Sequence, residues 1–197
     1  MTKLGYPAVF FCLKPRRGNE RDVFLFSVNQ FVFYNPTGIC QIKEICDKEF
    51  EGIGSKTYYL LKPVHNPLSE IYVPLDNEIL TGKMRGIMVR DEVYRLIDSL
   101  DDVQDGWIAD SRLRSKTFDQ IIKNGNSREL AEMLNTIVAY QQERIAAGKQ
   151  LQQADQHSLD KAERLLYQEL AFILEITPEE VPGFIRDRQR VVCSSLG

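Results

Sequence analysis

The N-terminal half of the chain contains the stretch QFVFYNPTGICQIKEI, residues 30–45. Residues 30–34 are rich in the aromatic and branched side chains that favour strands. Residues 35–38 read Asn-Pro-Thr-Gly, a combination that favours a turn. In residues 39–45 the odd-numbered and the even-numbered side chains form two alternating sets, which is typical of a second strand. The stretch therefore predicts two short strands joined by a turn.

The same pattern recurs further along the chain. Strand-forming residues gather at residues 57–61 and 70–74, and turn-forming residues precede each group at 51–55 and 65–67. Several short strands this close together predict a small β-barrel over residues 26–82. Closing a barrel removes the exposed edges that make isolated strands prone to aggregation.

The C-terminal half has the pattern of helices, with apolar residues at helical spacing and capping residues at the ends of segments. We expect helices at residues 91–100 and 112–123, after Ser127 as N-cap, from about Ser158, and from Thr177. The helix after Ser127 would end at Gly148, with these residues facing inward: Leu130, Leu134, Ile137, Val138 and Ile145. The pattern predicts a bundle of four or five helices.

The sequence as a whole predicts the α+β class, with a small N-terminal β-barrel followed by an all-α helical bundle. The barrel is expected over residues 26–82 and the helical domain over residues 84–190. Residues 1–25 have no clear periodicity and are expected to be unstructured, and residues 191–197 are expected to form a loose tail.

Composition sets broad limits on the class of protein. A chain of 197 residues can bury a core without disulfides or metals. The formal net charge of −3 gives no global nucleic-acid signature, so any basic surface has to be local. No apolar run is long enough for a transmembrane helix, and the N-terminal order of apolar and basic residues is the reverse of a secretory signal. We therefore expect a cytoplasmic protein.

Patterns that carry catalysis are absent from the sequence. It has no phosphate-binding glycine loop, no dinucleotide fingerprint and no nucleophile elbow. His65 stands in a turn and His157 near a helix start, and neither has a neighbour in sequence that would make it a general base. The cysteines form no C-x-x-C pair and have no histidine nearby: Cys12, Cys40, Cys46 and Cys193.

Five aspartates surround residue 100, namely Asp98, Asp101, Asp102, Asp105 and Asp110. Their spacing does not match a calcium-binding loop, and we interpret them as an acidic, solvated helix end and linker. The sequence thus predicts no catalytic residue, no metal and no cofactor, and we do not expect an enzyme.

Trp107, the single tryptophan, marks a sharp change in charge. Residues 91–110 contain one basic and seven acidic residues, whereas residues 111–124 contain four basic and one acidic. A basic face beside a large ring can bind phosphates and stack on unpaired bases. Alternatively, Trp107 packs where two domains join and the basic residues form a solvated face, since tryptophan is usually largely buried. The local sequence slightly favours the packing interpretation.

Five segments occur in an order that is specific in combination. They are VFYNPTGICQI (32–42), YYLL (58–61), IYVP (71–74), AERLLYQELA (162–171) and ITPEEV (176–181). In this order they resemble the CarD-like transcription regulators, whose N-terminal domain is shared with transcription-repair coupling factor. The last segment resembles a branch found in Gram-positive relatives. The resemblance covers about residues 26–187.

The resemblance implies a Tudor/SH3-like barrel that binds the RNA polymerase β subunit through Lys48, Phe50 and Tyr72, the last where some relatives have arginine. It implies a helical domain that contacts promoter DNA at the upstream edge of the bubble, where Trp107 acts as a wedge. The implied phosphate contacts are Arg112, Arg114, Lys116 and Lys161. Such contacts are largely independent of DNA sequence. We therefore expect a monomer that modulates open-complex stability and is nucleoid-associated through RNA polymerase.

A function of a different class remains open, namely a Tudor-like protein-interaction adaptor without direct DNA binding. The net acidity of the chain slightly favours this alternative.

Residues 1–24 match nothing in the family, whose members begin close to Phe26. Leu25 can be encoded by TTG, an alternative bacterial start codon, and residues 20–22 can be encoded by a purine run like a ribosome-binding site. We hypothesise that the protein starts at position 25 and that residues 1–24 are a mis-assigned extension.

Overall fold

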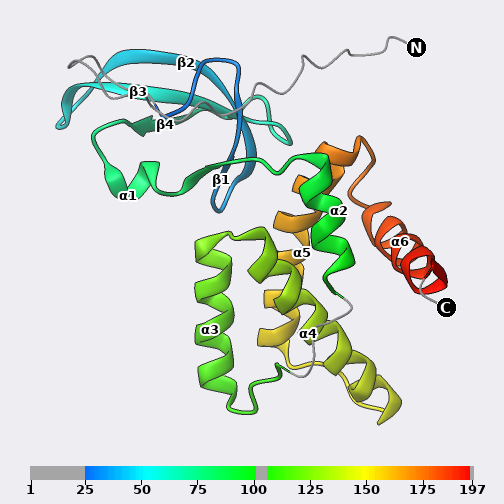
Figure 1. Ribbon diagram of the computed structural model, residues 1–197. Helices are drawn as coiled ribbons and strands as arrows, with labels where there is room; N and C mark the ends of the chain where they lie inside the picture. The colour runs from blue at the N-terminus through cyan, green and yellow to red at the C-terminus, as the bar shows by residue number, and fades with distance from the viewer. Residues whose placement is uncertain (1–24, 101–105, 196–197) are drawn as a thin grey trace.

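The computed structural model describes residues 25–100 and 106–195 as a curved sheet joined to a group of helices (Figure 1). The strands are β1 (Phe31–Tyr34), β2 (Gly38–Phe50), β3 (Gly54–Pro63), β4 (Ile71–Pro74) and β5 (Met84–Gly86). The helices are α1 (Glu78–Thr81), α2 (Arg90–Asp98), α3 (Ser111–Asn124), α4 (Ser127–Ala146), α5 (Gln153–Leu174) and α6 (Val181–Ser195). The strands precede most of the helices, and the predicted α+β class is confirmed.

The strands form one antiparallel sheet in the order β4-β3-β2-β1-β5. Within the described residues β4 and β5 are its edges and do not pair with each other, so the sheet is open and the predicted barrel is not confirmed. β5 pairs with β1, and this extends the sheet beyond residue 82, where its end was predicted. The three residues of β5 are too few to show the alternation that identifies a strand in sequence.

Strand β1 is buried on both of its faces. Val32 and Tyr34 lie in the apolar cluster of the sheet, together with Ile42 and Val73 from other strands. Phe33 points the other way and belongs to the core of the helices. Because side chains alternate along a strand, a strand covered on both sides carries an unbroken apolar run. The sheet and the helices therefore share their packing through β1.

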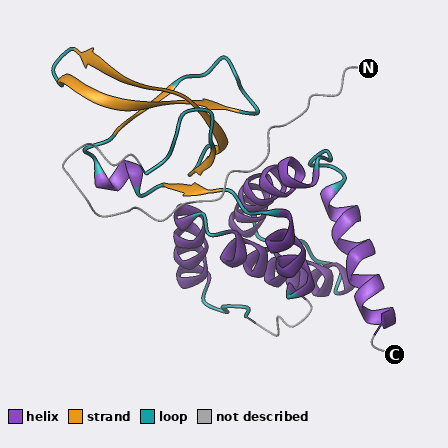
Figure 2. Cartoon of the chain, turned by 45° about the horizontal axis from the view of Figure 1, so that its top comes forward, coloured by secondary structure: helices purple, strands orange, loops and turns teal. Residues whose placement is uncertain are grey.

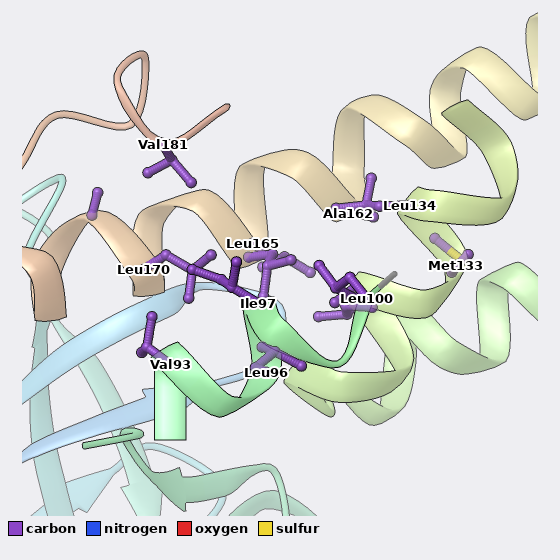
Figure 3. Packing of buried hydrophobic residues seen from close by; sticks show 14 of the residues in the cluster. Val93, Leu96, Ile97, Leu100, Met133, Leu134, Ala162, Leu165, Leu170 and Val181 are labelled. Atoms are coloured by element: carbon purple, nitrogen blue, oxygen red, sulfur yellow. The ribbon is translucent and has the colours of Figure 1, made fainter. Parts of the chain in front are cut away.

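The helical core is built mainly by α2, α4 and α5, as Figure 3 shows from close by. Ile97 of α2, Leu134 of α4 and Leu165 of α5 contribute to it, and Val181 at the start of α6 packs against the same cluster. Figure 2 shows these helices gathered on one side of the sheet. The opposite face of the sheet carries the apolar cluster that includes Ile42 and Val73, and Leu80 of α1 packs against that cluster.

Helix α4 differs from its predicted form at both ends. Asn126, and not Ser127, is the N-cap, because the Asn126 side chain accepts hydrogen bonds from two backbone N–H groups of the first turn. Ser127 is buried and donates to Glu169. Ile145 was predicted to face inward but is 65% exposed, since the buried face of α4 ends at Ile137.

The last two helices are displaced from their predicted bounds. α5 begins at Gln153, ahead of the predicted start near Ser158, because its first turn is polar and shows no apolar spacing. α6 begins at Val181, although the predicted interaction between Thr177 and Glu180 is partly present: the Thr177 backbone N–H donates to the Glu180 carboxylate. α6 continues to Ser195, so residues 191–195 are helical where a loose tail was predicted.

Some predictions lie outside the described residues, namely those on residues 1–24, which include Cys12, and those on the aspartates at 101, 102 and 105. Cys40 lies in the sheet core, where burial raises the pKa of its thiol to about 12. None of the described helices combines the length and the apolar character that crossing a membrane requires.

Candidate functional site

A cluster of aromatic side chains lies on the outer face of the sheet. Because residues paired across antiparallel strands project to the same side, Phe50 of β2, Tyr58 of β3 and Tyr72 of β4 share one face. Their ring centroids are 5.3 to 6.2 Å apart, and each pair is in edge-to-face geometry. Within the described residues they belong to neither of the two apolar cores. We call these three residues and Lys48 the outer aromatic face.

Lys48 lies over two of these rings. Its Nζ atom is 3.8 Å from the ring centroid of Tyr72 and 5.5 Å from that of Phe50. An aromatic ring attracts a cation at such a distance through its quadrupole. Hydrogen bonding to Tyr72 raises the pKa of Lys48 above its ordinary value. The structure thus brings together the three residues implied as polymerase contacts, in a composition typical of protein interfaces.

Tyr58 is the member of the outer aromatic face that sequence reasoning missed. It is buried, whereas Phe50 and Tyr72 are half-buried, so it forms the base on which they pack. The turn signal at residues 51–55 could have identified it. A turn centred there places the even-numbered residues of both strands on one face.

A second candidate site is a shallow groove between α3 and the start of α5, which we call the α3 groove. Its lining includes three exposed cations of α3, Arg112, Lys116 and Lys123. Their spacings of four and seven residues place them on one flank of the helix. The lining is otherwise mostly polar and includes Ser111, Ser115, Asp119, Gln120 and Gln152. Such a surface attracts anionic groups.

Arg114 lies beneath the groove rather than on its rim. It is 3% exposed, and its Nε and Nη2 atoms donate to the two carboxylate oxygens of Asp155 at 2.8 and 2.9 Å. Its Nη1 atom donates to the backbone oxygen of Ile108 at 2.7 Å. The guanidinium is therefore fully engaged inside the protein. We assign Arg114 a structural role and do not carry it forward as a phosphate contact.

Trp107 packs beside the first turn of α3. Its ring stacks on Tyr140 of α4, with centroids 3.6 Å apart and an interplanar angle of 16°. The guanidinium carbon of Arg114 lies 4.3 Å from the indole ring centroid, and Phe118 meets the indole edge to face. The indole is half-buried against the helical core. It would have to leave Tyr140 before it could stack on a base.

Replacing Trp107 by alanine is expected to lower the free energy of unfolding by about 2 kcal/mol, because truncating a fully buried aromatic costs about 3–5 kcal/mol and this one is half-buried. Urea unfolding followed by circular dichroism measures the change. Leu113→Ala, at an exposed position of α3, is the control. A loss no larger than that of the control would show that Trp107 has no packing role.

Lys161 lies on the flank of α5 that borders the α3 groove. Ala154 lines the groove, and the side chain of Gln168 lies close to Gly38 at the start of β2. Lys161 is seven residues from each of them, so the three residues fall on one flank of the helix. The cations of α3 therefore have a further cation, half-buried, on the neighbouring helix.

Comparison with protein families gives a match for the N-terminal part of the chain. The family model described as the CarD-like/TRCF RID domain matches residues 26–96. The match includes the whole sheet, the outer aromatic face and most of α2, and it ends before the α3 groove. No curated protein matches the chain. In the described part of the chain, no three metal-binding side chains lie close enough together to hold an ion.

Proposed function

We propose that the chain is a CarD-like transcription regulator that binds the β subunit of RNA polymerase through its outer aromatic face, because residues 26–96 match the family model of the CarD-like/TRCF RID domain. The observation that carries the proposal is the cluster of Phe50, Tyr58 and Tyr72 with Lys48 above it, outside both apolar cores. Large rings on a rigid sheet supply contact area at a low entropic cost.

We further propose that the helical part contacts promoter DNA through the α3 groove. Arg112, Lys116 and Lys123 lie on one flank of α3 and line the groove. Helical spacing puts Lys161 on the same flank of α5 as Ala154, which also lines the groove. Cations that neutralise backbone phosphates do not read bases, so this contact is largely independent of sequence. With the sheet held on polymerase, the groove acts at the upstream edge of the promoter bubble and modulates open-complex stability. The protein works there as a monomer, in the cytoplasm at the nucleoid.

The alternative is a protein-interaction adaptor that binds polymerase without touching DNA. Two observations favour it: the net charge of the chain is −3, and Asp119 stands among the cations of the α3 groove. Salt dependence separates the two functions, because phosphate contacts weaken steeply as salt rises.

The polymerase proposal predicts that Phe50→Ala combined with Tyr72→Ala weakens binding of the full chain to RNA polymerase by about thirtyfold, the effect of losing a 2 kcal/mol aromatic hot spot. Biolayer interferometry with core polymerase and with the isolated β subunit measures the affinity. Ile145→Ala, an exposed apolar residue on α4, is the matched control. Wild-type affinity in the double variant, or an equal loss in the control, would rule out this face.

A further inference from the structure

The C-terminal end of α3 is capped by residues of the sheet. The Asn35 side-chain amide, in the β1–β2 turn, donates to the backbone oxygens of Ile122 (2.8 Å) and Lys123. Arg85 of β5 donates from Nε to the backbone oxygen of Gly125 at 3.1 Å. Helix C-termini leave carbonyl groups without partners within the helix, and here the sheet supplies those partners from about 40 and 87 residues away.

The contact between the turn and the helix end leaves no spare room. Gly125 has φ of +65°, a conformation that side-chain-bearing residues rarely adopt. A Cβ atom added to it would lie 2.9 Å from the Asn35 amide nitrogen. Asn35 is itself buried. The β1–β2 turn is therefore seated directly on the end of α3.

Arg85 is held in turn by a carboxylate with no solvent exposure. Glu169 of α5 is 0% exposed, and its two oxygens accept from Nη1 and Nη2 of Arg85 at 2.7 Å each. Glu169 also accepts from the Ser127 hydroxyl at 2.8 Å, and the Arg85 guanidinium lies 4.0 Å from the ring centroid of Phe33. If Arg85 moved away, the buried Glu169 carboxylate would lose its cation, and an uncompensated buried charge is strongly destabilising.

We propose that Asn35, Arg85 and Glu169 form a positioning network that fixes the direction of the α3 groove relative to the outer aromatic face. The proposal rests on the function proposed above, since it states how two binding surfaces act as one. α3 carries the groove cations, and the sheet carries the outer aromatic face. Two linked contacts reinforce each other by about 10²–10⁴-fold only when their geometry permits both at once. When the angle between the outer aromatic face and the α3 groove is fixed, binding of the sheet to polymerase holds the groove next to the DNA. The effective concentration of the groove at the DNA is then raised.

The positioning role is tested on the free protein by double electron–electron resonance between spin labels at Ile53→Cys and Leu113→Cys, exposed positions in the β2–β3 turn and on α3. Cys12, Cys46 and Cys193 are replaced by serine, and buried Cys40 is kept. Arg85→Lys keeps the positive charge but cannot form the two parallel hydrogen bonds to Glu169. Asn35→Ala removes the side-chain amide that caps the end of α3. Arg188→Lys is the control, since Arg188 also forms a two-pronged ion pair, with Asp98, but between α2 and α6.

We expect one narrow distance distribution in the parent protein and in Arg188→Lys, and a broadened one in Arg85→Lys and Asn35→Ala, with thermal unfolding confirming that each variant folds. Unchanged distributions in both network variants would overturn the proposal.

The functional part compares open-complex lifetimes. The protein is expected to lengthen the lifetime of the open complex, and Arg85→Lys and Asn35→Ala should each reduce that increase by about tenfold. Their separate affinities for polymerase and for DNA should stay within about twofold of those of the parent protein. A retained lifetime despite a broadened distribution would also overturn the proposal. If the parent protein itself leaves the lifetime unchanged, the proposed function fails, and the spin-label distances still decide whether the network fixes α3.

Discussion

Replacing Asp155 by alanine is expected to lower the free energy of unfolding by about 3–5 kcal/mol. Asp155 and Arg114 are each about 4% exposed and share two hydrogen bonds of 2.8 and 2.9 Å. Without the carboxylate, the guanidinium would stay buried with a charge that no neighbour neutralises. Water can reach that charge only if the start of α3 separates from α5. The substitution therefore destabilises the folded protein.

Urea unfolding followed by circular dichroism measures this loss. Asp98→Ala is the matched control, because Asp98 pairs with Arg188 in the same two-pronged geometry while both side chains are about one third exposed. Exposed pairs contribute about 0–1 kcal/mol, so the control should lose little. The double substitution Arg114→Met with Asp155→Leu should recover most of the stability, since apolar residues can replace a buried pair. A loss below about 1 kcal/mol in Asp155→Ala would contradict this account.

The position of Arg114 could have been predicted from the sequence with more attention to spacing. Arg114 stands four and eight residues before Phe118 and Ile122, which are buried, so it shares their face of α3. Arg112, Lys116 and Lys123 fall on a different flank and are exposed. Grouping the cations by proximity in sequence placed a core residue among the surface ones, whereas helical periodicity separates them.

The long strands and helices were predictable because each carries its own periodicity and end signals. Elements β5 and α1 were not, since three or four residues cannot show a period. The network of Arg85 and Glu169 was beyond sequence reasoning for another reason. Its partners lie 84 residues apart, and nothing local to either residue indicates the other. Polar contacts between distant elements follow only from the assembled fold.

The DNA proposal predicts that the triple variant Arg112→Gln, Lys116→Gln, Lys123→Gln loses about a thousandfold in affinity for a forked duplex at 0.1 M salt. Each phosphate neutralised by the protein makes the slope of log K against log salt steeper by about 0.9. At 0.1 M salt, this corresponds to about a tenfold gain in binding affinity for each phosphate. The slope of the triple variant should therefore be shallower by about 2.7. Gel shift or fluorescence anisotropy over a salt series measures both quantities.

The control for this prediction has to remove the same charge elsewhere, because the chain is already acidic and any three lost cations would repel DNA. The variant Lys43→Gln, Arg128→Gln, Lys149→Gln does so at exposed positions outside the α3 groove. If both triple variants lose affinity equally with equal slopes, the groove makes no specific phosphate contacts. If the parent protein itself does not bind the forked duplex while polymerase binding persists, the adaptor function accounts for the protein. A loss of slope confined to the groove variant assigns the phosphates to α3, because counterion release reports contacts formed rather than total charge.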